Sequence, residues 1–272
     1  MVKINGIKFN DAEFHNGEVI FEATDIINKD KNIIELFFKD NKDITAVMFA
    51  RQWLKDKCPK ASCELIMKYC PYERMDREIN NQLFSMKYFA QILAKFDFAR
   101  IHILDPHSEV CVDLIKEQGM DVNILNLEEY VNKVINTFKP DYIFYPDKGA
   151  AKKYPNVLTG INIMHFFGKK KRDLANKGRI MDYELVDSPE LKGKKILIID
   201  DICCLGGTSY NAAKLMKEQG AKEVAFYISH CENGIFAGKL LKPDEAGEYI
   251  IDKIYTADTM LIDDIHDNIV II

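Results

Sequence analysis

The chain has 272 residues, 47% of them hydrophobic and 29% charged, which is typical of a globular protein and excludes a disordered one. The net charge of −5 argues against a broad nucleic-acid-binding surface, and no apolar run is long enough to span a membrane. An odd number of cysteines, seven, and an N-terminus without a signal-peptide pattern predict a reduced, cytoplasmic protein.

Short apolar runs alternate with amphipathic stretches, which predicts an α/β protein with a largely parallel sheet. We expect strands at 61–70, 99–105, 141–147, 194–201 and 223–229, and helices at 84–96, 127–138 and 209–220. Gly119 and Gly220 fall where a glycine ends a helix. "CVDLIKEQGMDVNIL" and "AAKLMKEQGAKEVAFYI" share a helix, a KEQG stop and a strand, so we expect two similar halves, residues 1–126 and 127–272.

The segment "ILIIDDICCLGGTS", residues 196–209, carries the strongest functional signal. Its apolar run predicts a buried strand that delivers Asp200 and Asp201 to its C-terminal end. The turn that follows contains Gly206, Gly207, Thr208 and Ser209. Glycines let backbone N–H groups approach phosphate oxygens, and paired carboxylates suit ribose hydroxyls and hydrated Mg²⁺. The aspartates alone could cap the next helix, and the glycines alone could form an ordinary turn. Their combination after a buried strand favours a ribose phosphate site.

This segment resembles the phosphoribosyl-diphosphate (PRPP) loop of type I phosphoribosyltransferases and of ribose-phosphate diphosphokinases. Three other segments resemble the diphosphokinases: "YCPYERMDRE" (69–78), "ILDPHSE" (103–109) and "FYPDKGAAKKY" (144–154). The resemblance implies two similar halves of type I phosphoribosyltransferase-like fold, each a mostly parallel sheet flanked by helices. It also implies that the N-terminal half binds ATP and that the C-terminal half binds ribose and diphosphate.

The resemblance also implies site residues in these three segments. It places Arg74, Asp76 and Arg77 in the ATP site, and assigns His107 to Mg²⁺-ATP binding and to catalysis. It places Asp147 against the ribose or the metal. Each has a structural alternative: a satisfied histidine at a strand end, surface ion pairs for the arginines, or a turn-forming aspartate.

Two further segments extend the resemblance. "FHNGE" (14–18) is similar to a segment that packs on adenine, which implies that Phe14, Asn16 and Glu18 contact ATP. "GKKKRD" (168–173) stands where the family has a mobile loop with a catalytic Lys and Arg, here Lys171 or Lys170 with Arg172. The alternative for this basic run is an ordinary solvated surface.

The implied reaction is diphosphoryl transfer. The 1-hydroxyl of a ribose attacks the β-phosphorus of Mg²⁺-ATP and AMP leaves. Cys204 and Leu205 stand where the family has Asp and Thr, and an apolar loop favours a 5-substituent that continues beyond its first phosphate. We therefore expect ADP-ribose to be modestly preferred over ribose 5-phosphate, for nucleotide or NAD salvage, and the chain resembles a phage-type salvage enzyme of this lineage.

Three further expectations complete this interpretation. The resemblance implies Mg²⁺ as the cofactor and a homo-oligomer as the assembly. A phosphoribosyltransferase that consumes PRPP is one alternative function. A non-catalytic, nucleotide-binding regulatory homologue is the other.

Overall fold

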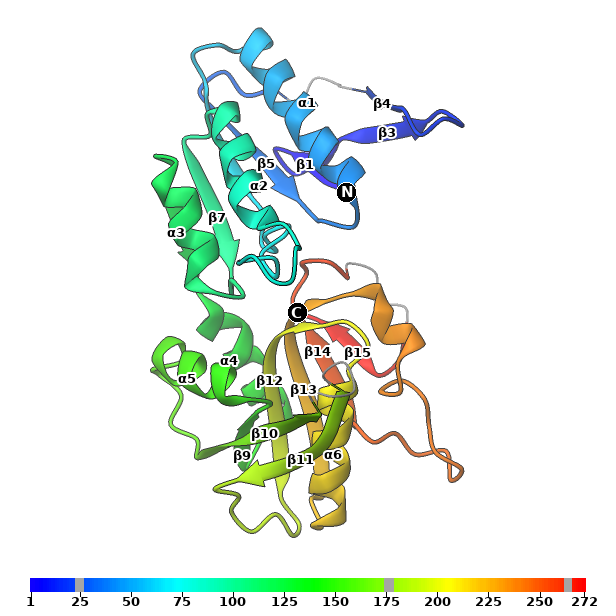
Figure 1. Ribbon diagram of the computed structural model, residues 1–272. Coiled ribbons are helices and arrows are strands. Elements are labelled where there is room, and N and C mark those ends of the chain that lie inside the picture. Colours follow the sequence, from blue (N-terminus) through cyan, green and yellow to red (C-terminus); the bar gives the residue numbers. More distant parts are fainter. Residues whose placement is uncertain (23–26, 174–178, 262–265) are drawn as a thin grey trace. The chain divides into compact units, whose positions relative to one another are not determined.

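The computed structural model describes residues 1–22, 27–173, 179–261 and 266–272, without the side chains of 10, 11 and 170–182. The chain divides into two compact units, Met1–Leu125 and Asn126–Ile272, here called the N-terminal and C-terminal units. This division lies beside the boundary expected near residue 126. Figure 1 labels many of their helices and strands.

The N-terminal unit is built on a sheet in which the described residues form six strands in the order β2-β1-β5-β6-β7-β8. These strands are β1 (Val2–Ile4), β2 (Ile7–Lys8), β5 (Lys31–Leu36), β6 (Ser62–Ile66), β7 (Arg100–Leu104) and β8 (Val122–Leu125). Strands β5 to β8 are parallel, whereas β1 is antiparallel to β2 and β5. A separate hairpin consists of β3 (Asn10–Glu13) and β4 (Val19–Glu22).

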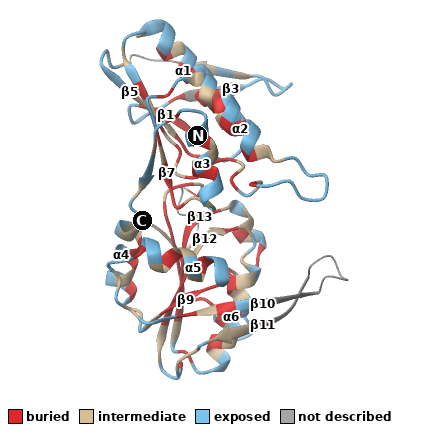
Figure 2. Ribbon diagram, turned by 60° about the vertical axis from the view of Figure 1, so that its left-hand side comes forward, coloured by how far each residue is buried: buried red, intermediate tan, exposed pale blue. Residues whose placement is uncertain are grey.

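The helices of this unit connect neighbouring parallel strands in chain order. They are α1 (Asn41–Lys57), α2 (Ser85–Leu93), the short η1 (Ala94–Phe96) and α3 (Glu109–Glu117). Because such crossovers are right-handed, α1, α2 and α3 lie on one face of the sheet. Their apolar sides form one core with the strand residues of that face, such as Ile34, Leu65 and Ile101. Figure 2 shows the buried residues along the strands and the exposed outer sides of the helices.

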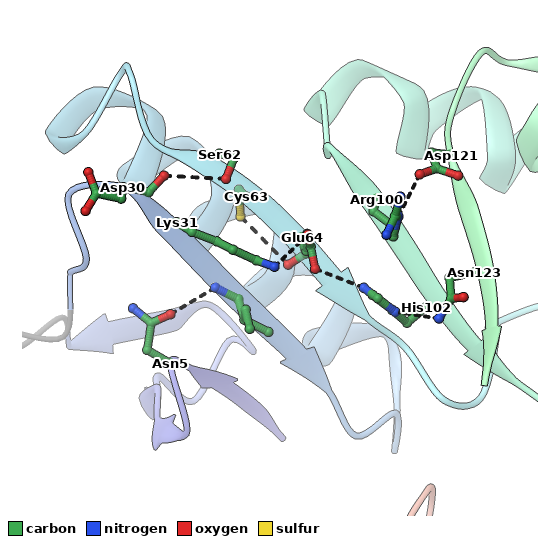
Figure 3. Close-up of polar contacts among 11 residues, drawn as sticks. Asn5, Asp30, Lys31, Ser62, Cys63, Glu64, Arg100, His102, Asp121 and Asn123 are labelled. Atoms are coloured by element: carbon green, nitrogen blue, oxygen red, sulfur yellow. Dashed lines mark hydrogen bonds and ion pairs between the residues drawn. The ribbon is translucent and has the colours of Figure 1, made fainter. Parts of the chain in front are cut away.

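Polar side chains join the parallel strands on the opposite face (Figure 3). Lys31 and Glu64 form an ion pair at 2.8 Å, and Glu64 lies 3.0 Å from His102 Nε2. The His102 ring in turn contacts the Asn123 amide at 3.0 Å. The hydrogen bond from Lys31 holds the pKa of Glu64 below its ordinary value. This face therefore consists partly of a cross-strand polar chain, in contrast to the apolar face under the helices.

The C-terminal unit contains a sheet whose described residues form seven strands in the order β11-β10-β9-β12-β13-β14-β15. The strands are β9 (Tyr142–Tyr145), β10 (His165–Asp173), β11 (Arg179–Val186), β12 (Lys195–Cys203), β13 (Glu223–Cys231), β14 (Lys253–Thr256) and β15 (Ile269–Ile271). Its helices are α4 (Leu127–Phe138), α5 (Lys148–Val157), α6 (Gly207–Glu218) and η3 (Asn233–Ala237). All neighbouring strands are parallel except β10 and β11.

The strand order of this sheet reverses beside β9. The chain crosses from β9 through α5 to β10 on one side, and it later returns to β12 on the other side. Right-handed crossovers then place α5 and α6 on opposite faces of the sheet. In open α/β sheets, ligands bind outside the carboxyl ends of the strands at such a reversal. The segments that follow β9 and β12 are therefore the first place to look for a site.

These observations confirm the predicted fold class, and helix 127–138 coincides with α4. Gly119 and Gly220 follow α3 and α6 with φ of 82° and 85°, as expected of glycines that end helices. The prediction of a loop at 168–173 is wrong, because this polar run lies in β10 and pairs with β11. Among the described residues, no helix is both long enough and apolar enough to cross a membrane.

Candidate active site

Strand β12 carries both predicted carboxylates before it ends. Asp200 pairs with Ile228 of β13, and pairing continues to Cys203, so the strand extends two residues beyond the predicted end. Asp200 Oδ1 accepts a hydrogen bond from Asp201 N at 3.1 Å, and Asp201 Oδ1 accepts one from Ile202 N at 2.8 Å. Both side chains are half-buried. The backbone therefore holds both carboxylates in place at the end of a buried strand.

The glycine turn after β12 leads directly into α6. Gly206 has a φ of 72°, a left-handed conformation that favours glycine, and it precedes the first residue of the helix. The first backbone bond of α6 runs from Tyr210 N to Gly206 O at 2.9 Å. The N–H groups of Gly207, Thr208 and Ser209 consequently have no carbonyl partner inside the helix. With the helix dipole, they suit a phosphate group, as the sequence predicts.

The loop Cys204–Gly206 packs closely against η3 and the residues after it. A Cβ added to Gly234 would lie 2.9 Å from Cys204 Sγ, and one added to Gly238 would overlap Leu205 O. The sequence analysis missed both glycines, because only their contacts in the folded chain reveal them. Residues 234 and 238 therefore support the loop through close contacts that only glycine allows.

We expect Gly238→Ala to displace the loop. The Leu205 carbonyl is backbone and cannot turn away, so the overlap must be relieved by a backbone shift, at a cost of about 2 kcal/mol. Thermal unfolding should show this loss, and amide hydrogen exchange of residues 204–207 should become faster. The matched control is Gly160→Ala, whose methyl group would meet only the Glu128 carboxylate, at 3.3 Å. Equal stability of the two variants would contradict the packing role.

Asp147 lies between β9 and α5 and is the N-cap of that helix. Its Oδ1 accepts hydrogen bonds from Gly149 N at 3.0 Å and Ala150 N at 3.1 Å. Asp147 thus has a structural role in the backbone turn that begins α5, which is the alternative considered for it. Its predicted role toward a ribose or a metal stays a prediction.

Tyr183 of β11 lies beside Pro146, the residue before Asp147. Its buried hydroxyl donates to Pro146 O at 2.7 Å. Burial raises the pKa of Tyr183, and the negative charges of Asp147 and Asp200 raise it further. The two carboxylates lie in one neighbourhood, because Asp147 follows β9, Asp200 lies near the end of β12, and these strands are parallel neighbours. Gly168 leaves room for this hydroxyl, since a Cβ there would overlap it. The sequence analysis missed Tyr183, because the residues around it are partly apolar and partly polar and form no motif.

The carboxylates of this neighbourhood fit Mg²⁺, which prefers oxygen ligands. No group of three or more His, Cys, Asp or Glu residues gathers as a metal site in the part of the chain that the structure describes. Mg²⁺ needs no such group, because it commonly binds through substrate phosphates, water and one or two carboxylates. Asp147 and Asp200 could supply those carboxylates.

In the N-terminal unit, two buried acids join the predicted ATP segments. Glu73 Oε2 accepts a hydrogen bond from His107 N at 3.2 Å, and Asp76 Oδ2 accepts one from Ser108 Oγ at 2.9 Å. Asp76 also accepts bonds from the Arg77 guanidinium at 2.8 and 3.2 Å. Arg77, and then Ser108, hold the pKa of Asp76 below its ordinary value. The segments 69–78 and 103–109 therefore lie together, and Glu73, which the sequence analysis missed, is one of the links.

Three of the predicted ATP-binding side chains lie at the surface of this pair of segments. Arg74, Arg77 and His107 are exposed, whereas Asp76 is buried. Asp105 follows β7 directly and has a φ of 45°, in the left-handed region, two residues before His107. The predicted cationic residues are thus accessible to a polyphosphate. Asp76 is placed to orient Arg77, and its predicted contact with ATP stays a prediction.

The predicted adenine-contacting residues lie at the turn between β3 and β4. Asn16 Oδ1 accepts a hydrogen bond from Glu18 N at 3.1 Å, so it holds the turn. Phe14 is 53% exposed. With Glu18 it lines a groove of about 570 Å³, whose other walls include Lys42 and Phe49 of α1. The groove is aromatic on both sides.

The basic run near residue 170 lies in a hairpin arm. Lys171 pairs with Asp182 and Arg172 with Ile180, with a bulge between them. The side chains of Lys170, Lys171 and Arg172 lie outside the described residues. Their predicted catalytic role therefore stays a prediction.

Comparison with known proteins shows what this chain is similar to. The family model described as phosphoribosyl transferase domain matches residues 123–264. Ribose-phosphate pyrophosphokinase of Saccharolobus solfataricus is 26% identical over 240 residues, 85% of this chain and 77% of the relative. Its counterpart of the same name in Pyrococcus abyssi is 29% identical over 178 residues, 64% of this chain and 58% of the relative. These matches confirm the predicted resemblance to ribose-phosphate diphosphokinases.

A solved structure shares the fold over nearly the whole chain. The crystal structure of phosphoribosylpyrophosphate synthetase from Mycobacterium smegmatis superposes with a TM-score of 0.73 at 20% identity. The superposition covers 97% of this chain and 85% of the other. At this level of identity the likeness concerns the fold.

Proposed function

Because this chain belongs to the phosphoribosyl transferase domain family, we propose that it is an ATP-dependent diphosphokinase that acts on a 5-phosphorylated ribose. It transfers the β,γ-diphosphoryl group of ATP to the ribose 1-hydroxyl and releases AMP. The supporting observation is that Glu73 and Asp76 hold the two diphosphokinase-like segments of the N-terminal unit together. A phosphoribosyltransferase that consumes PRPP has no need of such an arrangement.

The N-terminal unit would bind ATP. Arg74, Arg77 and His107 offer exposed donors for the triphosphate. Glu73 and Asp76 position two of these groups through the hydrogen bonds described above. Phe14 and Glu18 would receive the adenine in their groove. Lys171 and Arg172 are proposed to offset the charge that grows on the transferred group, since positioning and charge neutralisation dominate phosphoryl transfer.

The C-terminal unit would bind the ribose. Asp200 and Asp201 would accept hydrogen bonds from its 2- and 3-hydroxyls, and the amides of residues 207–209 would bind the 5-phosphate. When bound, Mg²⁺ would neutralise phosphate charge and lower the pKa of the attacking hydroxyl. Asp147 and Asp200 are the proposed ligands or outer partners of Mg²⁺ in the C-terminal unit. His107 has the proposed role of a Mg²⁺-ATP contact in the N-terminal unit.

The acceptor is proposed to be ADP-ribose in preference to ribose 5-phosphate. Leu205 is 55% exposed at the tip of the loop, where it offers apolar surface but no hydrogen-bond donor from its side chain. A diphosphate carries less charge on its first phosphate than a monoester does. The role in nucleotide or NAD salvage and the homo-oligomer are proposed from the resemblance. The cytoplasmic location is proposed from the odd number of cysteines and the N-terminus without a signal-peptide pattern.

We expect the purified chain to release AMP from ATP only when Mg²⁺ and a phosphorylated ribose are present. EDTA should abolish this release, because the triphosphate charge is then uncompensated. His107→Ala should lower kcat at least tenfold, since a donor to the triphosphate is lost. AMP would be measured by chromatography against reactions that lack the ribose.

The same assay distinguishes the alternatives. Base-dependent release of diphosphate from PRPP without ATP would establish a phosphoribosyltransferase instead. Nucleotide binding without turnover of either ribose would establish a regulatory homologue. Full activity of His107→Ala would remove this histidine from the site.

A further inference from the structure

Three side chains surround the phosphate-binding turn of the C-terminal unit. Tyr210 lies in the first turn of α6, and Lys239 Nζ lies over its ring, 5.5 Å from the centroid. Lys239 follows Gly238, whose backbone touches Leu205 O, and the Leu205 side chain is 55% exposed. A cation, an aromatic ring and an apolar side chain therefore border the same loop.

A single phosphate at this turn can be bound without the positive charge of Lys239. The amides of residues 207–209 and the helix dipole already stabilise one phosphate. In the part of the chain that the structure describes, Lys239 has no ion pair with a carboxylate, and its ammonium group lies over the Tyr210 ring. The ring contact restricts the long side chain beside the turn. The ammonium group of Lys239 is therefore held beside the first turn of α6, where a second phosphate joined to the first could pair with it.

Leu205 adds an apolar surface to the same border. An exposed leucine at the tip of a phosphate-binding loop costs hydrophobic free energy, which a ligand regains when it covers the side chain. A purine or other nucleoside group beyond the second phosphate has the flat apolar surface to do so.

From these contacts we propose an extension subsite formed by Leu205, Tyr210 and Lys239. It binds the second phosphate and the nucleoside of a ligand whose ribose 5-phosphate continues as a nucleoside diphosphate. Lys239 pairs with the second phosphate, Tyr210 holds Lys239 in place, and Leu205 contacts the nucleoside. This inference rests on the proposed function for the identity of the loop, and it names the residues that would select the longer acceptor.

The test compares binding of ADP-ribose and ribose 5-phosphate by titration calorimetry in the absence of ATP. We expect Lys239→Met to lower the preference for ADP-ribose about tenfold, the value of one charge-assisted phosphate contact. Leu205→Thr should shift the preference further toward ribose 5-phosphate. Lys214→Met is the matched control and should leave the preference unchanged, because Lys214 lies further along α6 in an exposed pair with Glu218.

The outcomes separate the two proposals. An unchanged ratio of dissociation constants in Lys239→Met, or an equal loss for both ligands, would overturn the extension subsite. Failure of the parent chain to release AMP with either ribose would overturn the diphosphokinase proposal. The binding preference would still report on the subsite in that case.

Discussion

Asp201→Asn is expected to lower kcat/KM for the ribose substrate about 100-fold, because hydrogen bonds from the ribose hydroxyls to a charged acceptor are lost. The amide oxygen of asparagine can still accept the bond from Ile202 N that Asp201 Oδ1 receives at 2.8 Å. The fold should therefore be retained, and the unfolding temperature should hardly change. The measurement is AMP release at saturating Mg²⁺-ATP while the ribose concentration is varied.

Glu218→Gln is the matched control for this charge change. Glu218 lies at the far end of α6, 56% exposed and paired only loosely with Lys214 at 3.9 Å. Its neutralisation should leave kcat/KM unchanged. If Asp201→Asn behaved in the same way, Asp201 would have no part in ribose binding.

Gly207→Ala is expected to raise KM for the ribose about tenfold or more without a loss of stability. An added Cβ at Gly207 meets nothing within 4 Å, and its backbone lies outside the left-handed region. Alanine is also favoured over glycine in a helix, by up to about 1 kcal/mol. A phosphate held by the amides of the first turn approaches the backbone to hydrogen-bond distance, so the methyl group would obstruct it.

Thermal unfolding and steady-state kinetics on the same preparation check both parts of this expectation. Gly238→Ala provides the contrast, because its methyl group overlaps the loop in the absence of any ligand. An unchanged KM in Gly207→Ala would mean that the phosphate does not approach this turn.

The parts of the fold that sequence reasoning found are those with a regular apolar pattern. Helix α4 was located to the residue because Asn126 caps it and Leu127, Val131, Val134 and Phe138 repeat on one face. Strand β10 was misread as a loop, because its second half is Lys-Lys-Lys-Arg-Asp and an antiparallel hairpin arm needs no apolar face there. Helix α1 was not predicted, since polar residues interrupt its buried face.

Candidate site residues could be predicted where they stand together in one segment of the sequence. They could not be predicted where their role depends on a contact between distant segments. Asp200, Asp201 and the glycine turn stand together in the sequence, so the sequence alone predicts a site there. Glu73 and Tyr183 act across about 34 and 37 residues of chain, on His107 and Pro146. A buried carboxylate in a turn or a tyrosine in a strand leaves no periodic signal, so these two residues were missed.

The packing of Gly234 and Gly238 against the loop has a consequence for the speed of ligand capture. A turn whose backbone is already supported has little conformational entropy to lose when a phosphate arrives. Association then needs no slow rearrangement before or after encounter, and the observed rate should rise in proportion to ligand concentration. The lifetime of the complex, rather than the rate at which it forms, would then distinguish one phosphorylated ribose from another.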